Sequence, residues 1–135
     1  MAKEKYILYS DGACRGNPGV GGAGAVITDA QGNVLWEGNE YLGHCTNNIA
    51  EYKALILGLK GALQKGYKHL EVYLDSELLV RQINGAYKVK NEKLKNLMRE
   101  IRSLIPSFEL IKVTHVARCR NAQADKLANL AIDKR

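Results

Sequence analysis

The sequence predicts an α/β domain built on a five-stranded mixed sheet, with three antiparallel strands followed by two parallel strands and helices on both faces. Two observations lead to this prediction. Three apolar, strand-like runs open the chain, and the later segments alternate between helical and strand-like periodicity. Such alternation implies parallel pairing through right-handed crossovers. The length of 135 residues fits a single domain over 1–135.

The composition is that of an ordinary globular protein, with 46% hydrophobic and 25% charged residues. Lysine and arginine number 20 against 14 acidic residues, and the net charge of +6 suits a polyanionic partner. Three cysteines at irregular spacing fit neither a disulfide framework nor a zinc site, and they favour a reducing compartment. No signal peptide or membrane span is visible, so we expect a cytoplasmic, monomeric protein without membrane contact.

The first strand is predicted over residues 5–10, and it ends at Asp11 before a glycine-rich turn. Strands over 22–28 and 34–41 flank a turn segment and should form an antiparallel hairpin. A carboxylate at the end of a central strand is costly to bury without a partner, which makes Asp11 a candidate functional residue. A hairpin turn that merely uses an aspartate is the alternative.

A helix is predicted to begin at a Thr46 or Asn47 cap and to end before Gly66. Small or apolar residues follow Glu51 at helical spacing: Ala54, Leu55, Gly58 and Ala62. This spacing places the carboxylate of Glu51 on the helix face that turns toward the sheet. A glutamate that only complements the helix dipole is the alternative.

A strand is predicted over 69–74, and Asp75 follows it at the junction with a short helix. Asp75 is alternatively just the N-cap of that helix. Binding sites in parallel sheets lie beyond the carboxyl ends of the strands. Asp11 and Asp75 are therefore expected at the same edge of the sheet.

Residues 85–91 lead into a helix over about 92–103, which has one apolar side and one basic side formed by Lys93, Lys95, Arg99 and Arg102. The basic side is either simply solvated or a ridge that faces phosphates. Pro106 stops this helix, and 108–116 is the fifth strand. The final helix, over about 122–134, turns an alanine-rich stripe inward and carries Asp125 in its first turn, where a plain dipole role is the alternative.

Four acids, Asp11, Glu51, Asp75 and Asp125, are thus expected to converge at one edge of the sheet. Clustered carboxylates repel, so a cation neutralises them or some stay protonated. Oxygen ligands without His or Cys favour Mg²⁺ or Mn²⁺. A pair of such ions supports phosphodiester cleavage. Polar residues near the same edge, Asn17, Thr46 and Asn47, are candidates to hold a nucleic-acid backbone.

The sequence resembles the type 1 ribonuclease H family over nearly its whole length. The resemblance rests on motifs in matching order and spacing: Ser10-Asp11-Gly12 with Gly16-Asn17-Pro18-Gly19, Thr46 to Glu51, Asp75-Ser76, and Asn121 to Asp125. It implies a ribonuclease H-like fold and hydrolysis of the RNA strand of RNA–DNA hybrids with two Mg²⁺ ions, Mn²⁺ being the expected substitute.

Residue by residue, the resemblance implies Asp11, Glu51, Asp75 and Asp125 as metal ligands. It implies nucleic-acid contacts at Cys14, Gly16, Asn17, Thr46, Asn47, Asn48 and Gln123. Activity on double-stranded RNA or as a resolvase stays open, and so does a non-catalytic hybrid-binding module, although a pure binder has no use for four repelling acids.

The sequence departs from the bacterial prototype of this family in two places. Residues 85–91 are too short to contain its basic handle, so the chain looks like the handle-less subgroup with archaeal and reverse-transcriptase-like members. The nearest replacements for the handle's charge are predicted to be Lys88, Lys90, Lys93 and Lys95. The loop before the last helix carries Arg118 where the prototype has a mobile histidine, and we predict an electrostatic role for it. The strand position of His115 makes it a doubtful substitute.

Overall fold

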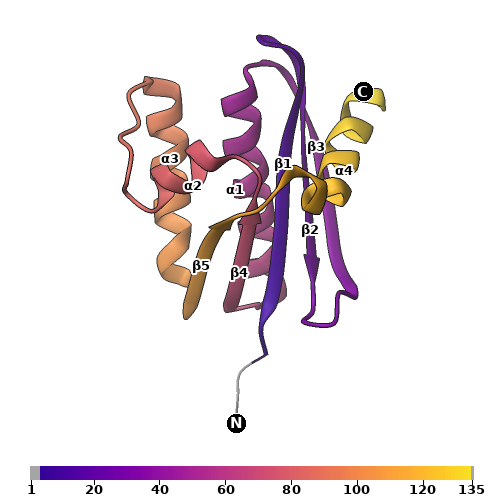
Figure 1. Ribbon diagram of the computed structural model, residues 1–135, viewed down its shortest axis with the longest axis vertical. Helices are drawn as coiled ribbons and strands as arrows, with labels where there is room; N and C mark the ends of the chain where they lie inside the picture. The colour runs from indigo at the N-terminus through magenta and orange to yellow at the C-terminus, as the bar shows by residue number, and fades with distance from the viewer. Residues whose placement is uncertain (1–3, 135) are drawn as a thin grey trace.

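The computed structural model describes residues 4–134; residues 1–3 and 135, which belong to the predicted domain, lie outside the described residues. Five strands form one sheet in the order β3-β2-β1-β4-β5 (Figure 1). Strands β1 (Tyr6–Gly16), β2 (Gly19–Thr28) and β3 (Val34–Cys45) pair antiparallel. Strands β4 (His69–Leu74) and β5 (Leu110–His115) run parallel to β1. The predicted sheet is therefore confirmed.

Four α-helices cover the sheet: α1 (Asn47–Lys65), α2 (Glu77–Ile83), α3 (Glu92–Leu104) and α4 (Ala122–Asp133). Single 3₁₀ turns at Ile105–Ser107 and Arg118–Asn121 precede β5 and α4. Helix α1 packs on one face of β1 and β2, with α3 beside it, and α4 packs on the other face (Figure 1). The predicted caps of α1 are confirmed, because the Thr46 side chain accepts from the Ile49 N–H and Gly66 has φ 78°.

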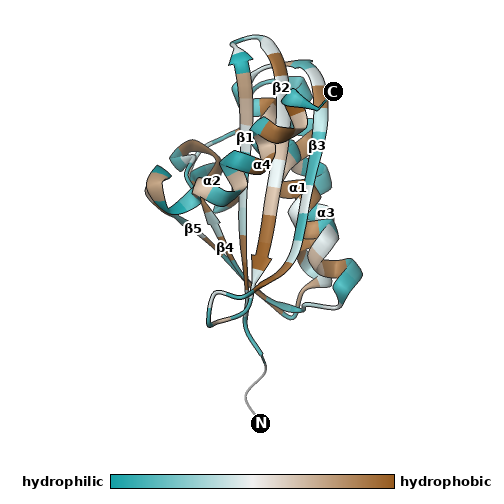
Figure 2. Ribbon diagram, turned by 90° about the vertical axis from the view of Figure 1, so that its right-hand side faces the viewer, coloured by the Kyte–Doolittle hydropathy of each residue, from teal (hydrophilic) through white to brown (hydrophobic). Residues whose placement is uncertain are grey.

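The main core lies between the sheet and α1. Its fully buried members come from β1, β2, β4, α1, α2 and α3, and include Leu8, Ile27, Leu55, Leu70 and Ile101. In Figure 2, hydrophobic residues gather on the strands and on the helix faces that meet them. On the opposite face, a Cβ on Gly22 or Gly24 would lie 2.2 Å from a carbonyl oxygen of α4, so this close approach requires glycine. No helix among residues 4–134 is long and apolar enough to cross a membrane.

The first hairpin differs from its prediction. Strand β1 continues to Gly16 and β2 begins at Gly19, so the glycine-rich segment extends the ladder and only Asn17-Pro18, joined by a cis peptide bond, form the turn. Asp11 therefore lies inside β1, paired with Gly24, and the prediction that it ends the strand is wrong. Glycines mimic a turn in the sequence, but backbone hydrogen bonds between strands need no side chains.

The remaining boundaries shift by a few residues. Strand β3 continues to Cys45 instead of residue 41, and β5 spans Leu110–His115 instead of 108–116. Strand β4 has its predicted bounds. The basic loop before α4 is a 3₁₀ turn. None of these shifts changes which segments meet at the edge where Asp75 follows β4.

Candidate active site

The acids meet where β4 ends beside the longer β1. The parallel pairing of these strands runs from Tyr6 and Leu70 to Tyr9 and Tyr73. Strand β4 stops at Leu74, whereas β1 continues past it to Asp11 and beyond. Although Asp11 does not end its strand, it lies two positions after Tyr9, the last residue of β1 that pairs with β4. Asp75 likewise lies two positions after Tyr73, the partner of Tyr9 in β4. Both acids therefore lie just past the parallel ladder, as predicted.

Helix α1 brings Glu51 to the same place because residue 12 is glycine. A Cβ at position 12 would lie 2.2 Å from the carbonyl carbon of Ala50 and 2.4 Å from the nitrogen of Glu51. The first turns of α1 thus rest directly on the backbone of β1. The Gly12 N–H donates a hydrogen bond to the Glu51 carboxylate. This contact fixes the carboxylate beside Asp11.

Three carboxyl groups form a compact cluster. One oxygen each from Asp11, Glu51 and Asp75 lie within 4.8 Å of one another. Asp11 is only 2% exposed. The Oδ2 atom of Asp11 and the Oε2 atom of Glu51 are buried and accept no hydrogen bond. Buried carboxylate oxygens without donors are costly, and a hard cation with oxygen preference satisfies them. The residues present therefore fit a divalent metal ion.

The electrostatics of the cluster reflect burial and mutual repulsion. Burial, followed by the charge of Glu51, raises the pKa of Asp11 well above its ordinary value. Burial also raises the pKa of Glu51, with repulsion from Asp75 adding to the shift. Hydrogen bonds from Asp11 and Gly12 and the positive charge of Arg118 oppose it. Without a cation the cluster therefore holds protons that ordinary carboxyls have lost near neutral pH.

Asp125, the fourth predicted acid, lies beside Asp11. Its hydrogen-bond interaction with Asp11 is one of the smaller causes that raise the pKa of Asp11. The Nδ2 group of Asn129 donates to the Oδ1 atom of Asp125 over 3.4 Å. Asp125 is outside the compact group of three. The structure thus brings all four acids to one edge, but three of them lie closest together.

Asn121 joins the cluster to the sheet, a role that the sequence motif did not reveal. Its side chain is 1% exposed, and its Nδ2 group donates to the carbonyl oxygen of Ser10 over 2.8 Å and to Oδ2 of Asp75 over 3.2 Å. Asn121 occupies the N-cap position of α4 without capping it. Ser76, rather than Asp75, caps α2 through its hydroxyl. The alternative that Asp75 is only an N-cap is therefore wrong.

The cluster opens onto a cleft of about 300 Å³ lined by Gly12, Asn47, Asn48, Glu51, Asp75, Ser76 and Arg118. A second groove, lined in part by Asn17, Thr46 and Asn48, continues from it toward the start of α3. The Asn47 N–H donates to Oδ1 of Asn17 over 3.1 Å, which ties the turn of the first hairpin to α1. Five predicted site residues, Asn17, Thr46, Asn47, Asn48 and Arg118, therefore border one continuous surface.

Other predicted residues lie elsewhere. The Sγ atom of Cys14 is 3.1 Å from the Cys45 carbonyl oxygen, and Gly16 holds φ 97° at the hairpin turn. Gln123 is exposed and lines a separate hollow with Tyr9, over the opposite face of the sheet. His115 is exposed at the end of β5 and does not line the cleft.

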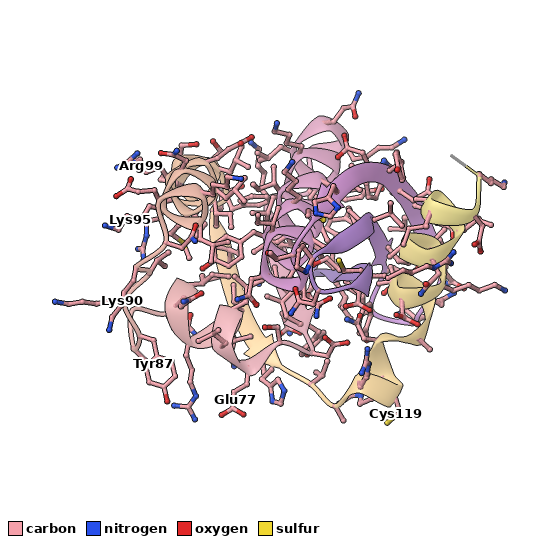
Figure 3. The ribbon with its side chains drawn as sticks, turned by 90° about the horizontal axis from the view of Figure 1, so that it is seen from above. Glu77, Tyr87, Lys90, Lys95, Arg99 and Cys119 are labelled. Atoms are coloured by element: carbon pink, nitrogen blue, oxygen red, sulfur yellow. The ribbon has the colours of Figure 1, made fainter. Side chains whose placement is uncertain are left out.

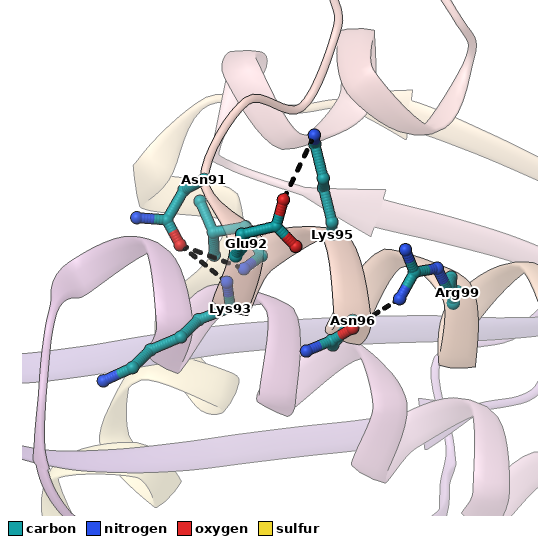
Figure 4. Close-up of polar contacts among 7 residues, drawn as sticks. Asn91, Glu92, Lys93, Lys95, Asn96 and Arg99 are labelled. Atoms are coloured by element: carbon teal, nitrogen blue, oxygen red, sulfur yellow. Dashed lines mark hydrogen bonds and ion pairs between the residues drawn. The ribbon is translucent and has the colours of Figure 1, made fainter.

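The basic residues near α3 do not form one ridge. Lys93 lines the groove with Asn17, whereas Lys88 and Lys95 line a different hollow. Figure 4 shows Lys93 and Lys95 pointing away from each other. Lys90 extends outward from the loop (Figure 3). Residues two apart on a helix lie on different sides of it, which explains the division.

Comparisons with known proteins agree with this geometry. A family described as "Reverse transcriptase-like" matches residues 9–131. The chain is 42% identical to a bifunctional protein of Mycobacterium tuberculosis, over 96% of this chain and 36% of that protein. It is 40% identical to ribonuclease HI of Halobacterium salinarum, over 93% of this chain and 63% of that protein. A ribonuclease H of Rickettsia bellii is 34% identical, over 92% of this chain and 86% of that protein.

Two solved structures are similarly close. RNase H1 from Halobacterium salinarum matches with a TM-score of 0.94 and 38% identity, covering 97% of this chain and 99% of that one. LC11-RNase H1, solved in complex with an RNA/DNA hybrid, matches with a TM-score of 0.88 and 45% identity, covering 96% and 97%. The chain belongs to the type 1 ribonuclease H family. It spans about a third of the mycobacterial relative's length and less than two thirds of the halobacterial one's.

Proposed function

We propose that the protein is a metal-dependent endoribonuclease that hydrolyses the RNA strand of RNA–DNA hybrids. The observation that carries the proposal is the compact group of Asp11, Glu51 and Asp75, with buried oxygens that lack donors, at the floor of an open polar cleft. The similarity to LC11-RNase H1, which was solved with an RNA/DNA hybrid, supports the choice of substrate.

The three clustered acids would hold the metal, with Asp125 as a further ligand beside Asp11. Two divalent ions, when bound, activate water and stabilise the leaving oxygen in phosphodiester cleavage. We assign Mg²⁺ as the resident ion and Mn²⁺ as its substitute, because the donors are carboxylate oxygens. Metal-activated water as the nucleophile leaves 3′-hydroxyl and 5′-phosphate ends.

The other residues of the cleft bind and orient the substrate. Asn47, Asn48 and Asn17 offer amide groups, and Thr46 adds a hydroxyl, along the surface that leads away from the acids. Cys14, Gly16 and Gln123 lie outside the cleft, and their weaker contacts in this proposal rest on the family resemblance alone. Lys88 and Lys90 attract phosphates. Arg118 lies in the cleft, and its positive charge opposes the upward pKa shift of Glu51. A guanidinium keeps its proton at neutral pH, so it acts electrostatically rather than as a proton shuttle.

The proposal includes a monomeric enzyme in the cytoplasm, where a reducing setting suits the free thiols of Cys14, Cys45 and Cys119. A binding module without catalysis would gain nothing from the compact group of acids. Activity on double-stranded RNA depends on contacts to 2′-hydroxyl groups, so a direct comparison of substrates decides it.

One gel assay tests the proposal. Labelled RNA–DNA hybrid, double-stranded RNA and double-stranded DNA are each incubated with Mg²⁺, Mn²⁺ or chelator. We expect cleavage of the RNA strand of the hybrid with either metal and none with chelator. Asp11→Asn should abolish it, whereas Glu40→Gln, an exposed carboxyl change on β3, should not. Hybrid binding without cleavage would favour the binding module, and preferred cleavage of double-stranded RNA would favour the other nuclease.

A further inference from the structure

A second hollow lies between the α2–α3 connection and α3. Its volume is about 520 Å³, and its lining includes Tyr87, Lys88, Lys95, Met98, Arg99 and Arg102. None of these residues lines the acid cleft. Helix α2 joins the two sites, because its cap Ser76 borders the acid cleft and its C-terminal end leads into the loop that carries Tyr87. Seven residues of helix span about 10 Å.

The lining of this hollow is strongly cationic. Lys88, Lys95, Arg99 and Arg102 contribute four positive charges, and no acidic residue lines it. Lys95 lies 3.5 Å from the exposed carboxylate of Glu92, and an exposed ion pair of this kind compensates its charge only weakly. Arg99 donates to the neutral Asn96 side chain (Figure 4). An anion with several oxygens, such as the phosphates of a nucleic-acid strand, complements this surface.

An aromatic ring stands at the side of the same hollow. Tyr87 is 50% exposed, an unusual position for a large ring. The guanidinium of Arg81 lies 5.5 Å from the ring centroid, and Glu77 holds Arg81 through an ion pair of 2.8 Å. Arg81 does not line the hollow, so it braces the ring from elsewhere and leaves Tyr87 as part of the wall. In Figure 3, Tyr87, Lys90, Lys95 and Arg99 extend along one side of the molecule.

We infer that this hollow binds an unpaired nucleotide of a strand that continues beyond the hybrid, with the base against Tyr87 and the phosphates among Lys88, Lys95 and Arg99. A base inside a duplex is stacked and hidden, so the exposed ring selects single-stranded nucleotides. Met98, which is 4% exposed, supplies an apolar floor for the base. The length of α2, about 10 Å, corresponds to roughly three steps of a strand. That the neighbouring site holds an RNA–DNA hybrid rests on the proposed function, whereas binding of a single strand in this hollow does not.

The test measures binding in the full chain carrying Asp11→Asn, so that no probe is cleaved. Fluorescent probes are a blunt hybrid, the same hybrid with a single-stranded DNA extension at either end, and the single-stranded DNA alone. We expect an extension to tighten binding roughly 5-fold or more, the range that stacking of one base provides. Tyr87→Ala should remove this gain and Tyr87→Phe should keep it. No gain from either extension, or a gain that survives Tyr87→Ala, overturns the inference.

Salt dependence supplies a second readout. Removing Lys88 and Arg99 together by alanine substitution should lower the log–log salt slope for the single strand by about 1.4, while Lys126→Ala, on the opposite face of the sheet, leaves it nearly unchanged. If the Lys88 and Arg99 double substitution weakens heparin binding as much as DNA binding, and Tyr87→Ala does not change DNA binding, the hollow is only a patch of positive charge and the nucleotide site is refuted. If the unmodified chain cleaves the hybrid but an extension does not tighten binding, this inference alone is rejected. If single-stranded DNA binding depends on Tyr87 but the unmodified chain does not cleave the hybrid, the proposed function alone is rejected.

Discussion

Replacing Asp11 by Asn should stabilise the metal-free protein at neutral and higher pH. At these pH values the metal-free cluster either keeps protons that the unfolded chain releases or holds repelling charges within 4.8 Å of one another, and Asn at position 11 avoids both costs at nearly constant volume. Two unit charges at this distance repel by about 3.5 kcal/mol at an effective dielectric constant of 20 and by about 0.9 kcal/mol in water. Since the cluster borders an open cleft, we expect a gain of about 1–3 kcal/mol.

The sign of the pH dependence follows from the raised pKa values of Asp11 and Glu51. A carboxyl whose pKa is higher in the folded state binds more protons there than in the unfolded chain. The contribution of these two carboxyls to the stability of the metal-free wild type is therefore fully present below the unfolded pKa, near pH 4, and is lost as the pH rises from there toward their raised pKa values. The advantage of Asp11→Asn should be small near pH 4 and should grow toward pH 8.

Thermal unfolding in chelator, followed by circular dichroism at several pH values, measures this effect. A gain of 1–3 kcal/mol corresponds to roughly 3–10 °C for a chain of this size. Saturating Mg²⁺ binds the folded wild type and should add about 2.7 kcal/mol to its free energy of unfolding at 100 times Kd, which raises its melting temperature. The melting temperature of Asp11→Asn should rise much less. Glu40→Gln serves as the control and should shift neither value. A lower melting temperature for Asp11→Asn at pH 8 in chelator would refute the reasoning.

Three further predictions concern the surroundings of the cluster. Arg118→Ala should lower turnover more than hybrid affinity, while His115→Ala should leave turnover nearly unchanged. Turnover and hybrid affinity of both variants are measured between pH 6 and 10. Loss of a titration near neutral pH in His115→Ala alone would contradict this prediction. Asn121→Ala should cost about 1–3 kcal/mol of stability and weaken Mg²⁺ binding, because Asp75 loses its donor; calorimetry showing unchanged Mg²⁺ affinity would argue against that role. Lys93→Ala should reduce the salt slope of hybrid binding by about 0.9, and an equal slope would mean that Lys93 is only solvated.

The parts of the fold that the sequence predicts best are those with local signals. Strand β4 has its predicted bounds because an alternating apolar pattern lies between two clear turn signals. Helix α1 has its predicted caps because Thr46 and Gly66 satisfy the backbone groups at its two ends by local contacts. Glu51 followed from the same helical periodicity, and its predicted direction is confirmed by the cluster that it joins.

Contacts between distant segments could not be predicted in this way. The continuation of β1 through Asp11 depends on backbone pairing with β2, to which glycine side chains contribute no pattern. The hydrogen bond from Asn121 to Asp75 joins residues 46 positions apart, and no periodicity encodes it. The sequence does, however, predict that Lys93 and Lys95 lie on different sides of α3, because residues two apart on a helix face different directions. Treating the basic residues of α3 as one side hid that signal.

The most direct test of the central claim is the chemistry of the product ends. Hybrid is cleaved by the wild-type protein in ¹⁸O-labelled water with Mg²⁺, and the RNA fragments are analysed by mass spectrometry. If the carboxylate cluster holds ions that activate water, each new 5′-phosphate carries one ¹⁸O atom and each new 3′ end is a hydroxyl. Fragments that end in a 2′,3′-cyclic phosphate, or cleavage that continues in excess chelator, would contradict the account.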